Sequence, residues 1–207
     1  MSNDTRTVIE WRIPPGARAD WLMGAGATRA ERSLICAGSL VGVALVIAMI
    51  MRGEPGGWSW WQYLLAGVIA ADLCGGAVSN ATNSTKRQYF GPDFEHAGGA
   101  GRVARSPVTF TALHIYPFVI VALFPGGTWG WATAMYAIVV ASAVIVDRVV
   151  PRYLQRPVAM LVFVIALLIS MFLVAPPGWA WFPVIYLAKL VLAHAVREEP
   201  YRPSPRT

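Results

Sequence analysis

Apolar residues in this chain gather in six long blocks, separated by short polar or Gly/Pro-rich connections. Most blocks approach the ~20 residues that an α-helix needs to cross a hydrocarbon core of about 30 Å. The blocks cover roughly 33–51, 59–84, 107–124, 129–146, 157–175 and 179–196. This pattern predicts an all-α integral membrane protein: a six-transmembrane-helix bundle built of three helical hairpins.

The third and sixth blocks are the least apolar, and each contains a proline. Pro117 and Pro183 stand inside otherwise helical patterns. A proline lacks the backbone donor and clashes with the preceding turn, but in a membrane the neighbouring helices can satisfy the freed carbonyl. We therefore expect both helices to bend.

Positive charge lies at one end of the blocks. The connections 125–128 and 176–178 carry no charge, whereas 85–106 and 147–156 contain Lys86, Arg87, Arg102, Arg105, Arg148, Arg152 and Arg156. Because basic residues are retained in cytoplasmic loops, this asymmetry predicts a multi-pass protein of the cell inner membrane with both termini cytoplasmic.

Tryptophan marks the opposite end of the blocks. Three short turns of similar composition carry the motifs GGWSWW, GGTWGW and PPGWAW, with Trp58, Trp60, Trp61, Trp129, Trp131, Trp179 and Trp181. Trp is enriched where a helix passes from lipid to water. The tryptophans are expected to form an aromatic belt at the outer interface.

Two polar segments flank the transmembrane domain, 33–196. The cytoplasmic segment 1–32 shows no cleavable signal peptide, and its part 14–32 is expected to hold a short interfacial helix with Trp21, Leu22 and Met23 against lipid. The tail 197–207 is Pro-rich and charged, so disorder is expected there.

Composition agrees with a membrane protein and argues against a nucleic-acid partner. Of the 207 residues, 56% are hydrophobic and 14% are charged, against about 25% charged in a typical soluble domain. The net charge of +6 comes from basic residues at the ends of the blocks rather than from a binding face. Cys36 and Cys74 both lie in apolar blocks, which favours neither a disulfide framework nor a metal site.

A polar stripe runs along the second block. Asp72, Gly76, Ser79, Asn80 and Asn83 recur at intervals of three and four and so share one helical face. The stripe continues into the basic pair at positions 86 and 87. Such a face cannot meet acyl chains without a large cost in free energy, so it must contact other helices or a water-filled cavity.

The depths of other polar residues point to the same cavity. At a rise of ~1.5 Å per residue, Asp72 lies about 20 Å from either end of its block, and His114 and Lys189 lie ~12 Å from the cytoplasmic side. Tyr89 and His194 lie near its mouth. Blocks two, three and six are therefore expected to form one cavity that is open to the cytoplasm.

The leading hypothesis is a membrane-embedded enzyme that acts on a lipid or isoprenoid by cyclisation, isomerisation or hydrolysis. Asp72 would be the general acid or base, since desolvation helps a carboxyl to hold a proton at neutral pH. His114 would be its partner. Asn80, Asn83, Tyr89 and Tyr116 would orient the substrate, and Lys86, Arg87 or Lys189 would hold a phosphate or carboxylate head group. No metal or cofactor is expected, and the second block lacks the Asp-x-x-x-Asp pair of magnesium-dependent prenyl transferases.

Two other functions remain open. A small proton-coupled transporter would use Asp72 as its coupling carboxylate beside Gly75 and Gly76, and with six helices it would be expected to form a homodimer. A non-catalytic scaffold would use the polar groups to bind another membrane protein, and a protonated Asp72 could simply join two helices.

The segment 91–102 is the one long loop between blocks. Its Asp93, Glu95 and His96 are of metal-ligating type, and its glycines with Arg102 could approach a phosphate. Neither spacing matches a specific motif, so a solvated connection is the favoured interpretation.

Overall fold

The computed structural model describes residues 7–53, 57–94 and 99–203. Within these residues the regular secondary structure is helical apart from one short two-stranded ladder, and turns and irregular segments connect the elements. Four of the described helices are long and apolar enough to cross a membrane: α1 (Arg29–Arg52), α2 (Trp60–Ala81), α7 (Trp129–Val144) continued by the π-helix η2 (Ile145–Val149), and α8 (Gln155–Ser170) preceded by the 3₁₀ turn η3 (Arg152–Leu154). These helices are compatible with a multi-pass membrane protein.

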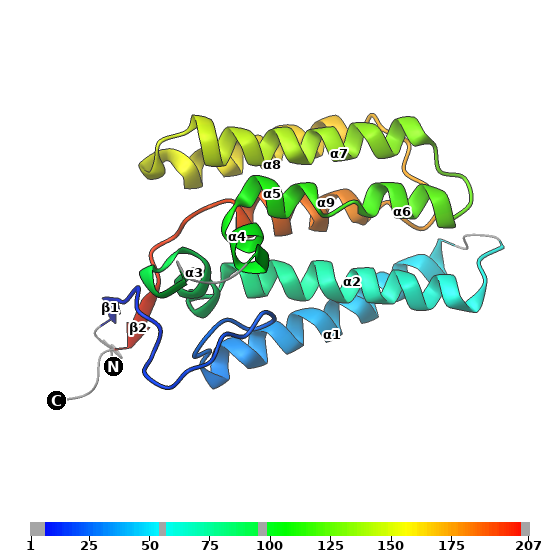
Figure 1. Cartoon of the computed structure of the whole chain (residues 1–207). Coiled ribbons are helices and arrows are strands. Elements are labelled where there is room, and N and C mark those ends of the chain that lie inside the picture. Colours follow the sequence, from blue (N-terminus) through cyan, green and yellow to red (C-terminus); the bar gives the residue numbers. More distant parts are fainter. Residues whose placement is uncertain (1–6, 54–56, 95–98, 204–207) are drawn as a thin grey trace, which may run out of the picture.

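Two shorter apolar segments complete the bundle. The first joins α5 (Pro107–Ala112) to α6 (Tyr116–Leu123), and the second joins α9 (Phe182–Leu187) to the π-helix η4 (Ala188–His194). Figure 1 shows α1 and α2 along one side, α7 and α8 along the other, and α5, α6 and α9 between them, in agreement with their contacts.

Small residues bring α1 and α2 into close contact. A Cβ atom on Gly38 would lie 2.7 Å from Val78, and one on Gly42 would collide with Cys74. Small residues at i and i+4 let two helix backbones approach closely, and such approach is a main source of helix association in membranes. Helix α1 contacts little besides α2, so most of its surface faces outward.

The prolines act differently from the predicted bends. Pro117 lies in the first turn of α6, and the helix is interrupted just before it, over 113–115. Pro183 lies in the first turn of α9 and therefore starts that helix instead of bending it. Both positions suit proline, because the first turn of a helix has no use for its missing N–H group.

At the tryptophan end of the bundle, several rings pack against one another in the interior instead of facing lipid. Phe124 packs between Trp58 and Trp179 in tilted and edge-to-face contacts, with ring centroids 4.6 and 4.8 Å apart. Four of the seven tryptophans, Trp58, Trp131, Trp179 and Trp181, are buried, while Trp60, Trp61 and Trp129 are exposed. Position along the chain sets the depth of a ring but not the direction in which it points, so the predicted belt is wrong for the four buried rings.

The opposite end holds the N-terminal and C-terminal segments. Strand β1 (Thr7–Ile9) pairs antiparallel with β2 (Tyr201–Pro203), so the two segments meet at this end of the bundle (Figure 1). Disorder was expected over the whole tail, but residues 201–203 are ordered by this backbone pairing. Residues 204–207 lie outside the described range. No interfacial helix forms before α1: residues 20–23 make turns, with Trp21 and Leu22 exposed.

Three further short helices cover the same end: α3 (Asn83–Phe90), the 3₁₀ turn η1 (Pro92–Phe94) and α4 (Gly99–Arg105). Asp93 accepts a hydrogen bond of 2.7 Å from the backbone N–H of Ile13. Glu95, His96 and the side chain of Arg102 lie outside the described residues. Among the residues that are described, no three His, Cys, Asp or Glu side chains gather as a metal site.

Candidate functional site

Asp72 is the centre of a polar cluster inside the bundle. Its Oδ2 accepts hydrogen bonds from Lys189 Nζ at 2.5 Å and from the Tyr116 hydroxyl at 2.7 Å. The three side chains come from α2, η4 and α6. The side chain of Lys189 is only 3% exposed, whereas that of Asp72 is 40% exposed. The carboxylate is therefore accessible, while the ammonium that compensates its charge is shielded behind it.

Glycine 76 makes room for this ion pair. A Cβ atom at Gly76 would lie 2.6 Å from Cε and 3.0 Å from Nζ of Lys189. Gly75 serves a different contact, since its Cβ would collide with the hydroxyl of Ser39 on α1. The two adjacent glycines thus bring two different helices close to α2, one on each side of Asp72.

His114 lies in the gap between α5 and α6. Its Nδ1 is 2.7 Å from the carbonyl oxygen of Phe110, so Nδ1 carries the proton and donates it. In the neutral ring Nε2 is then an acceptor. The backbone carbonyl of His114 accepts a hydrogen bond from Tyr186 at 2.5 Å, which fixes the gap against α9. No hydrogen bond joins His114 to Asp72 among the described residues, so the two share a cavity rather than a contact.

A cavity of about 500 Å³ opens in front of Asp72. Its walls come from α1, α2, the segment 21–23, α3, α5 and η4. The polar lining residues are Ser39, Asp72, Ser79, Asn80, Tyr89, His114 and Lys189, and the apolar ones include Trp21, Leu22, Met23, Ile35, Leu40 and Phe110. The predicted convergence of Asp72, His114, Lys189 and Asn80 is therefore present, and Tyr116 joins them through Asp72.

Asn80, in the wall of this cavity, has an amide nitrogen that is buried and without a partner in the described part of the chain. Its side chain is 6% exposed, and its Nδ2 has no hydrogen-bond partner among the described residues. A buried amide without a partner costs free energy of about 1–3 kcal/mol.

The N-terminal strap, residues 20–24, forms one wall of the cavity, although Trp21, Leu22 and Met23 were expected to lie against lipid in an interfacial helix. Three side chains of α2 and α3 hold consecutive strap carbonyls: Tyr89 donates to that of Trp21, Ser79 to that of Leu22 and Ser84 to that of Met23. Gly24 has a φ of +78°, and a Cβ there would collide with the backbone of Thr85. Only glycine permits so close an approach in that conformation.

Three predicted site residues lie away from the cavity. Thr82 adopts an extended conformation with ψ of 151°, which ends α2 and starts α3 in a new direction. As a result the polar stripe stops at Asn80. Asn83 accepts from the backbone N–H of Tyr201 at 2.9 Å, and the buried Arg87 reaches the Tyr201 carbonyl at 3.5 Å.

Lys86 instead caps the end of η4. It is 2% exposed, and its Nζ donates to the carbonyls of Ala193 and Val196. Burial lowers the pKa of Lys86 to about 8, although Glu198 acts to raise it. Lys86 is thus committed to the backbone and is not available to a head group, contrary to the expectation from its place in the basic loop.

Two aromatic residues lie near the mouth. Burial, with a contribution from Asp20, raises the pKa of Tyr89 to about 12, so its hydroxyl stays protonated and can donate at neutral pH. His194 is 1% exposed and stacks on Phe110 with centroids 3.8 Å apart. It lies behind the cavity wall rather than on it.

The chemical capacity of the cavity is proton transfer next to an apolar surface. It offers a half-exposed carboxylate with two donors on one oxygen, a neutral imidazole and an unpaired amide donor, together with apolar side chains from α1 and the N-terminal strap. No protein-family model, no curated protein and no solved structure matches this chain.

Proposed function

We propose that this protein is a membrane-embedded enzyme that acts on a lipid or isoprenoid by proton transfer, with Asp72 as the base. The observation that carries the proposal is the accessible Asp72 carboxylate, paired at 2.5 Å with the shielded Lys189 in a cavity of about 500 Å³. A charged pair in the interior of a membrane protein is costly and usually serves a function.

The ion pair supports a proposed direction of proton transfer, from the substrate to Asp72. Lys189 and Tyr116 both donate to Oδ2 and stabilise an ionised carboxylate. The other oxygen, Oδ1, receives no hydrogen bond within the described part of the chain and is the atom that would take the proton. An ionised, partly exposed carboxylate is suited to be a base, so the alternative of Asp72 as the resting acid is set aside.

The remaining polar groups would then bind and reprotonate the substrate. Asn80 lies in the cavity wall, and after a rotation of its buried amide it would be in place to bind an oxygen of the substrate. The proton that Asp72 removes from one position can be returned to another, which gives an isomerisation without any net change in protons. His114 would be the second proton carrier of this scheme: its Nε2 carries no proton in this tautomer, so it would first accept the proton that Asp72 has removed and then return it to the substrate.

Apolar surface around the cavity favours a substrate with a hydrocarbon chain. Leu22 and Leu40 line the cavity and are exposed, and Leu113 is exposed beside it. A second hollow of about 570 Å³ shares Trp21, Tyr89, Phe110 and His114 with the cavity and extends towards Leu113 and Tyr116. Because α1 contacts little besides α2, the cavity adjoins the outer surface between α1 and α5, where acyl chains would lie.

The placement in the membrane is part of the proposal. We infer six crossings, with α5–α6 and α9–η4 as the third and sixth, arranged as three hairpins whose tryptophan turns face outward. The N-terminal and C-terminal segments would both be cytoplasmic, in the inner cell membrane, because the end where they meet is also the basic end. The cavity would open in the cytoplasmic half of the bilayer.

A proton-coupled transporter remains the second candidate, and one feature favours it. The segments around the ion pair are irregular: α5 and α6 are separated at His114, and Lys189 belongs to a π-helix. Discontinuous helices near the membrane midplane are common in transporters, and π-helical turns often occur at functional sites in general.

The test compares lipid conversion by matched variants. Asp72→Asn alone would leave the Lys189 ammonium buried and unpaired, at a cost of about 3–5 kcal/mol, so the informative variant is Asp72→Asn/Lys189→Met, which removes both charges. Asp93→Asn, on the surface away from the cavity, is the control. Each purified protein is incubated with lipids extracted from its native membrane, and every lipid species is followed by mass spectrometry.

The wild type and Asp93→Asn are expected to convert one lipid species into a product, and the double variant to lose ~10²–10⁴-fold in rate. Native mass spectrometry should show that the double variant still binds the substrate. Equal conversion by the double variant would refute the role of Asp72. A wild type that converts nothing but moves a solute across vesicle membranes would replace the enzyme with the transporter.

A further inference from the structure

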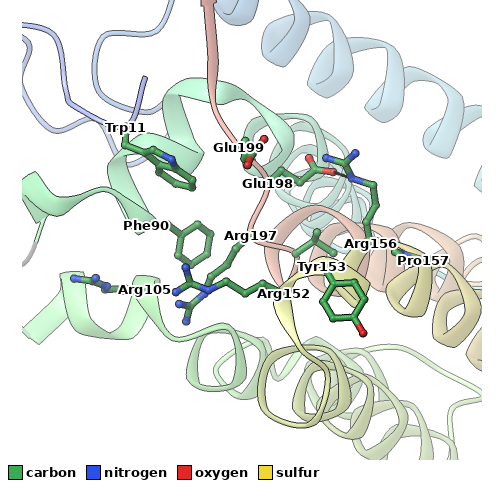
Figure 2. Close-up of a pocket in the computed structure, with 11 residues that line it drawn as sticks. Trp11, Phe90, Arg105, Arg152, Tyr153, Arg156, Pro157, Arg197, Glu198 and Glu199 are labelled. Carbon is green, nitrogen blue, oxygen red and sulfur yellow. Dashed lines mark ion pairs between the residues drawn. The ribbon is translucent and has the colours of Figure 1, made fainter. Parts of the chain in front are cut away.

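A second cavity, separate from the one at Asp72, lies at the basic end of the bundle. It encloses about 730 Å³ between the N-terminal segment, α3, α4, η3, the start of α8 and the segment that follows η4. Figure 2 shows its lining: the four arginines Arg105, Arg152, Arg156 and Arg197, the aromatic residues Trp11, Phe90 and Tyr153, and the two acids Glu198 and Glu199.

The described lining of this cavity contains more arginines than acids. Glu198 is committed to Arg156, with Nε to Oε1 at 2.9 Å, and Glu199 is exposed beside the Tyr201 hydroxyl. Four arginines against two glutamates leave an excess of two positive charges in the lining. Outside the lining, Asp147 is shared between Arg148 and Arg197.

Arg197 is held in a way that suits an anion. Its guanidinium lies over the ring of Phe90, 5.1 Å from the centroid, and its buried Nε has no hydrogen-bond partner among the described residues. Burial and repulsion from Arg152, Arg105 and Arg148 lower the pKa of Arg197, while Asp147 raises it. The arginines therefore repel one another in the empty cavity, and an anion between them would relieve that repulsion.

We propose that this cavity binds the phosphate group of an anionic phospholipid, with Arg152 and Arg197 as its principal ligands. Guanidinium groups bind phosphate oxygens in pairs with matching geometry. Basic pockets between membrane helices on the cytoplasmic side are typical sites for phospholipid head groups.

The position of the cavity favours a lipid over a soluble phosphate. It lies where α8 begins, beside Pro157, and Tyr153 at its rim is 81% exposed. In the proposed topology this is the level of the cytoplasmic head groups, where Trp and Tyr side chains are enriched. The assignment uses the membrane orientation proposed above but not the chemistry at Asp72, so either can fail without the other.

The test measures lipid binding by native mass spectrometry in detergent. The probes are phosphatidylglycerol, phosphatidylcholine, and glycerol 3-phosphate as the soluble phosphate ester. The main variant is Arg152→Gln, because Arg152 is exposed and its replacement leaves no buried group unpaired. The matched control is Arg29→Gln, an equally exposed arginine at the start of α1 that lies outside this cavity.

Wild type and Arg29→Gln are expected to retain phosphatidylglycerol over phosphatidylcholine, and Arg152→Gln to bind it about five- to tenfold more weakly. Arg152→Glu should weaken it further. An equal loss in Arg29→Gln would show general surface charge and overturn the site. Glycerol 3-phosphate binding as tightly as the lipid would overturn the lipid as ligand, and the absence of any difference between wild type and Arg152→Gln would overturn the proposal as a whole.

Discussion

In the ion pair between Asp72 and Lys189, the two side chains differ in exposure. The proposed role of Asp72 as a base depends on this difference. A buried ion pair of two shielded groups would mainly hold helices together, and often with little net gain in stability. Here Lys189 is shielded and Asp72 faces the cavity. The lysine supplies a fixed positive charge, and the carboxylate remains reachable.

A single added methyl group at Gly76 tests the placement of Lys189 beside Asp72. Gly76→Ala would place a methyl group 2.6 Å from Lys189 Cε and push the ammonium away from Asp72. We expect a loss of about 1–3 kcal/mol in stability from the overpacking and a larger proportional loss in substrate conversion. Thermal unfolding in detergent and the lipid-conversion assay measure the two effects.

The control for this substitution is on the same helix. At Gly67 a new Cβ atom would meet only Ile47 and Val43, both at 4.0 Å, which is ordinary contact. Gly67→Ala should therefore keep activity and, through its helix propensity, be neutral or slightly stabilising. Similar behaviour of the two alanine variants would contradict the role assigned to Gly76.

The sequence located some site residues and misplaced others for identifiable reasons. Asp72 and Asn80 share a helical face, and periodicity alone places them together. Asn83 was assigned to the same face, but the extended conformation of Thr82 rotates everything that follows. The unpaired Nδ2 of Asn80 depends on packing in three dimensions, which spacing along the chain does not encode.

At the scale of elements, the π-helix η4 depends on a cap supplied from another helix. Lys86 of α3 donates to the carbonyls of Ala193 and Val196, where η4 ends. A π-helix is rarer and less stable than an α-helix, so its end gains from a donor of this kind. The same helix carries Lys189, and the cap therefore helps to position the ion pair.

The pKa of Lys86 predicts how stability depends on pH. In the folded protein the pKa is about 8, lowered from 10.5. Below pH 8 the lysine is charged in both states, and the folded state bears the cost of burying that charge. Between pH 8 and 10.5 the unfolded chain binds more protons, so the free energy of unfolding rises with pH, by at most about 1.4 kcal/mol per unit.

The measurement is the difference between wild type and Lys86→Met. Denaturation profiles at pH 7, 8, 9 and 10 should diverge, with the wild type gaining stability relative to the variant above pH 8. Tyr89, whose pKa of about 12 has the opposite effect on stability at higher pH, is present in both proteins, so its contribution cancels in the difference. Parallel profiles would mean that Lys86 keeps an ordinary pKa in the folded protein.

Helix interruptions were the elements least accessible to sequence reasoning. Pro117 was expected to bend a continuous helix, yet the chain leaves the helix over 113–115 and restarts at Tyr116. The Tyr186 hydroxyl stabilises this gap by donating a hydrogen bond to the backbone carbonyl of His114. A tertiary contact of this kind, 72 residues away in the chain, has no local signature.

At the scale of the whole molecule, the proposed topology predicts which residues are reachable from each side of the membrane. Three single cysteines at Trp60, Gly130 and Ala180 would probe the tryptophan turns, and one at Tyr153 the basic end; all four positions are exposed. Cys36 and Cys74 are replaced by alanine. In right-side-out vesicles a membrane-impermeant maleimide should label the first three at once and Tyr153→Cys only after permeabilisation.

Each outcome has a separate meaning for the fold. Labelling of all three turns supports three hairpins and six crossings. Failure at one turn would reduce the number of crossings, and rapid labelling of Tyr153→Cys alone would invert the orientation.

The all-helical, membrane-compatible character was predictable because hydrophobic block length is a direct physical requirement. The enclosure of a cavity by the N-terminal strap was not, because its contacts are made by backbone carbonyls, which every residue type has.

The β1–β2 ladder has a consequence for the order in which the protein matures. The N-terminal strap that walls the Asp72 cavity is followed by α1 and preceded by β1, and β1 finds its partner only in residues 201–203. During synthesis the first helices are made long before that partner leaves the ribosome. The segment before the strap can therefore be tied down only after residues 201–203 have been synthesised, and a chain released before residue 201 would carry the entire ion-pair cluster with the strap held by its contacts to α2 and α3 alone.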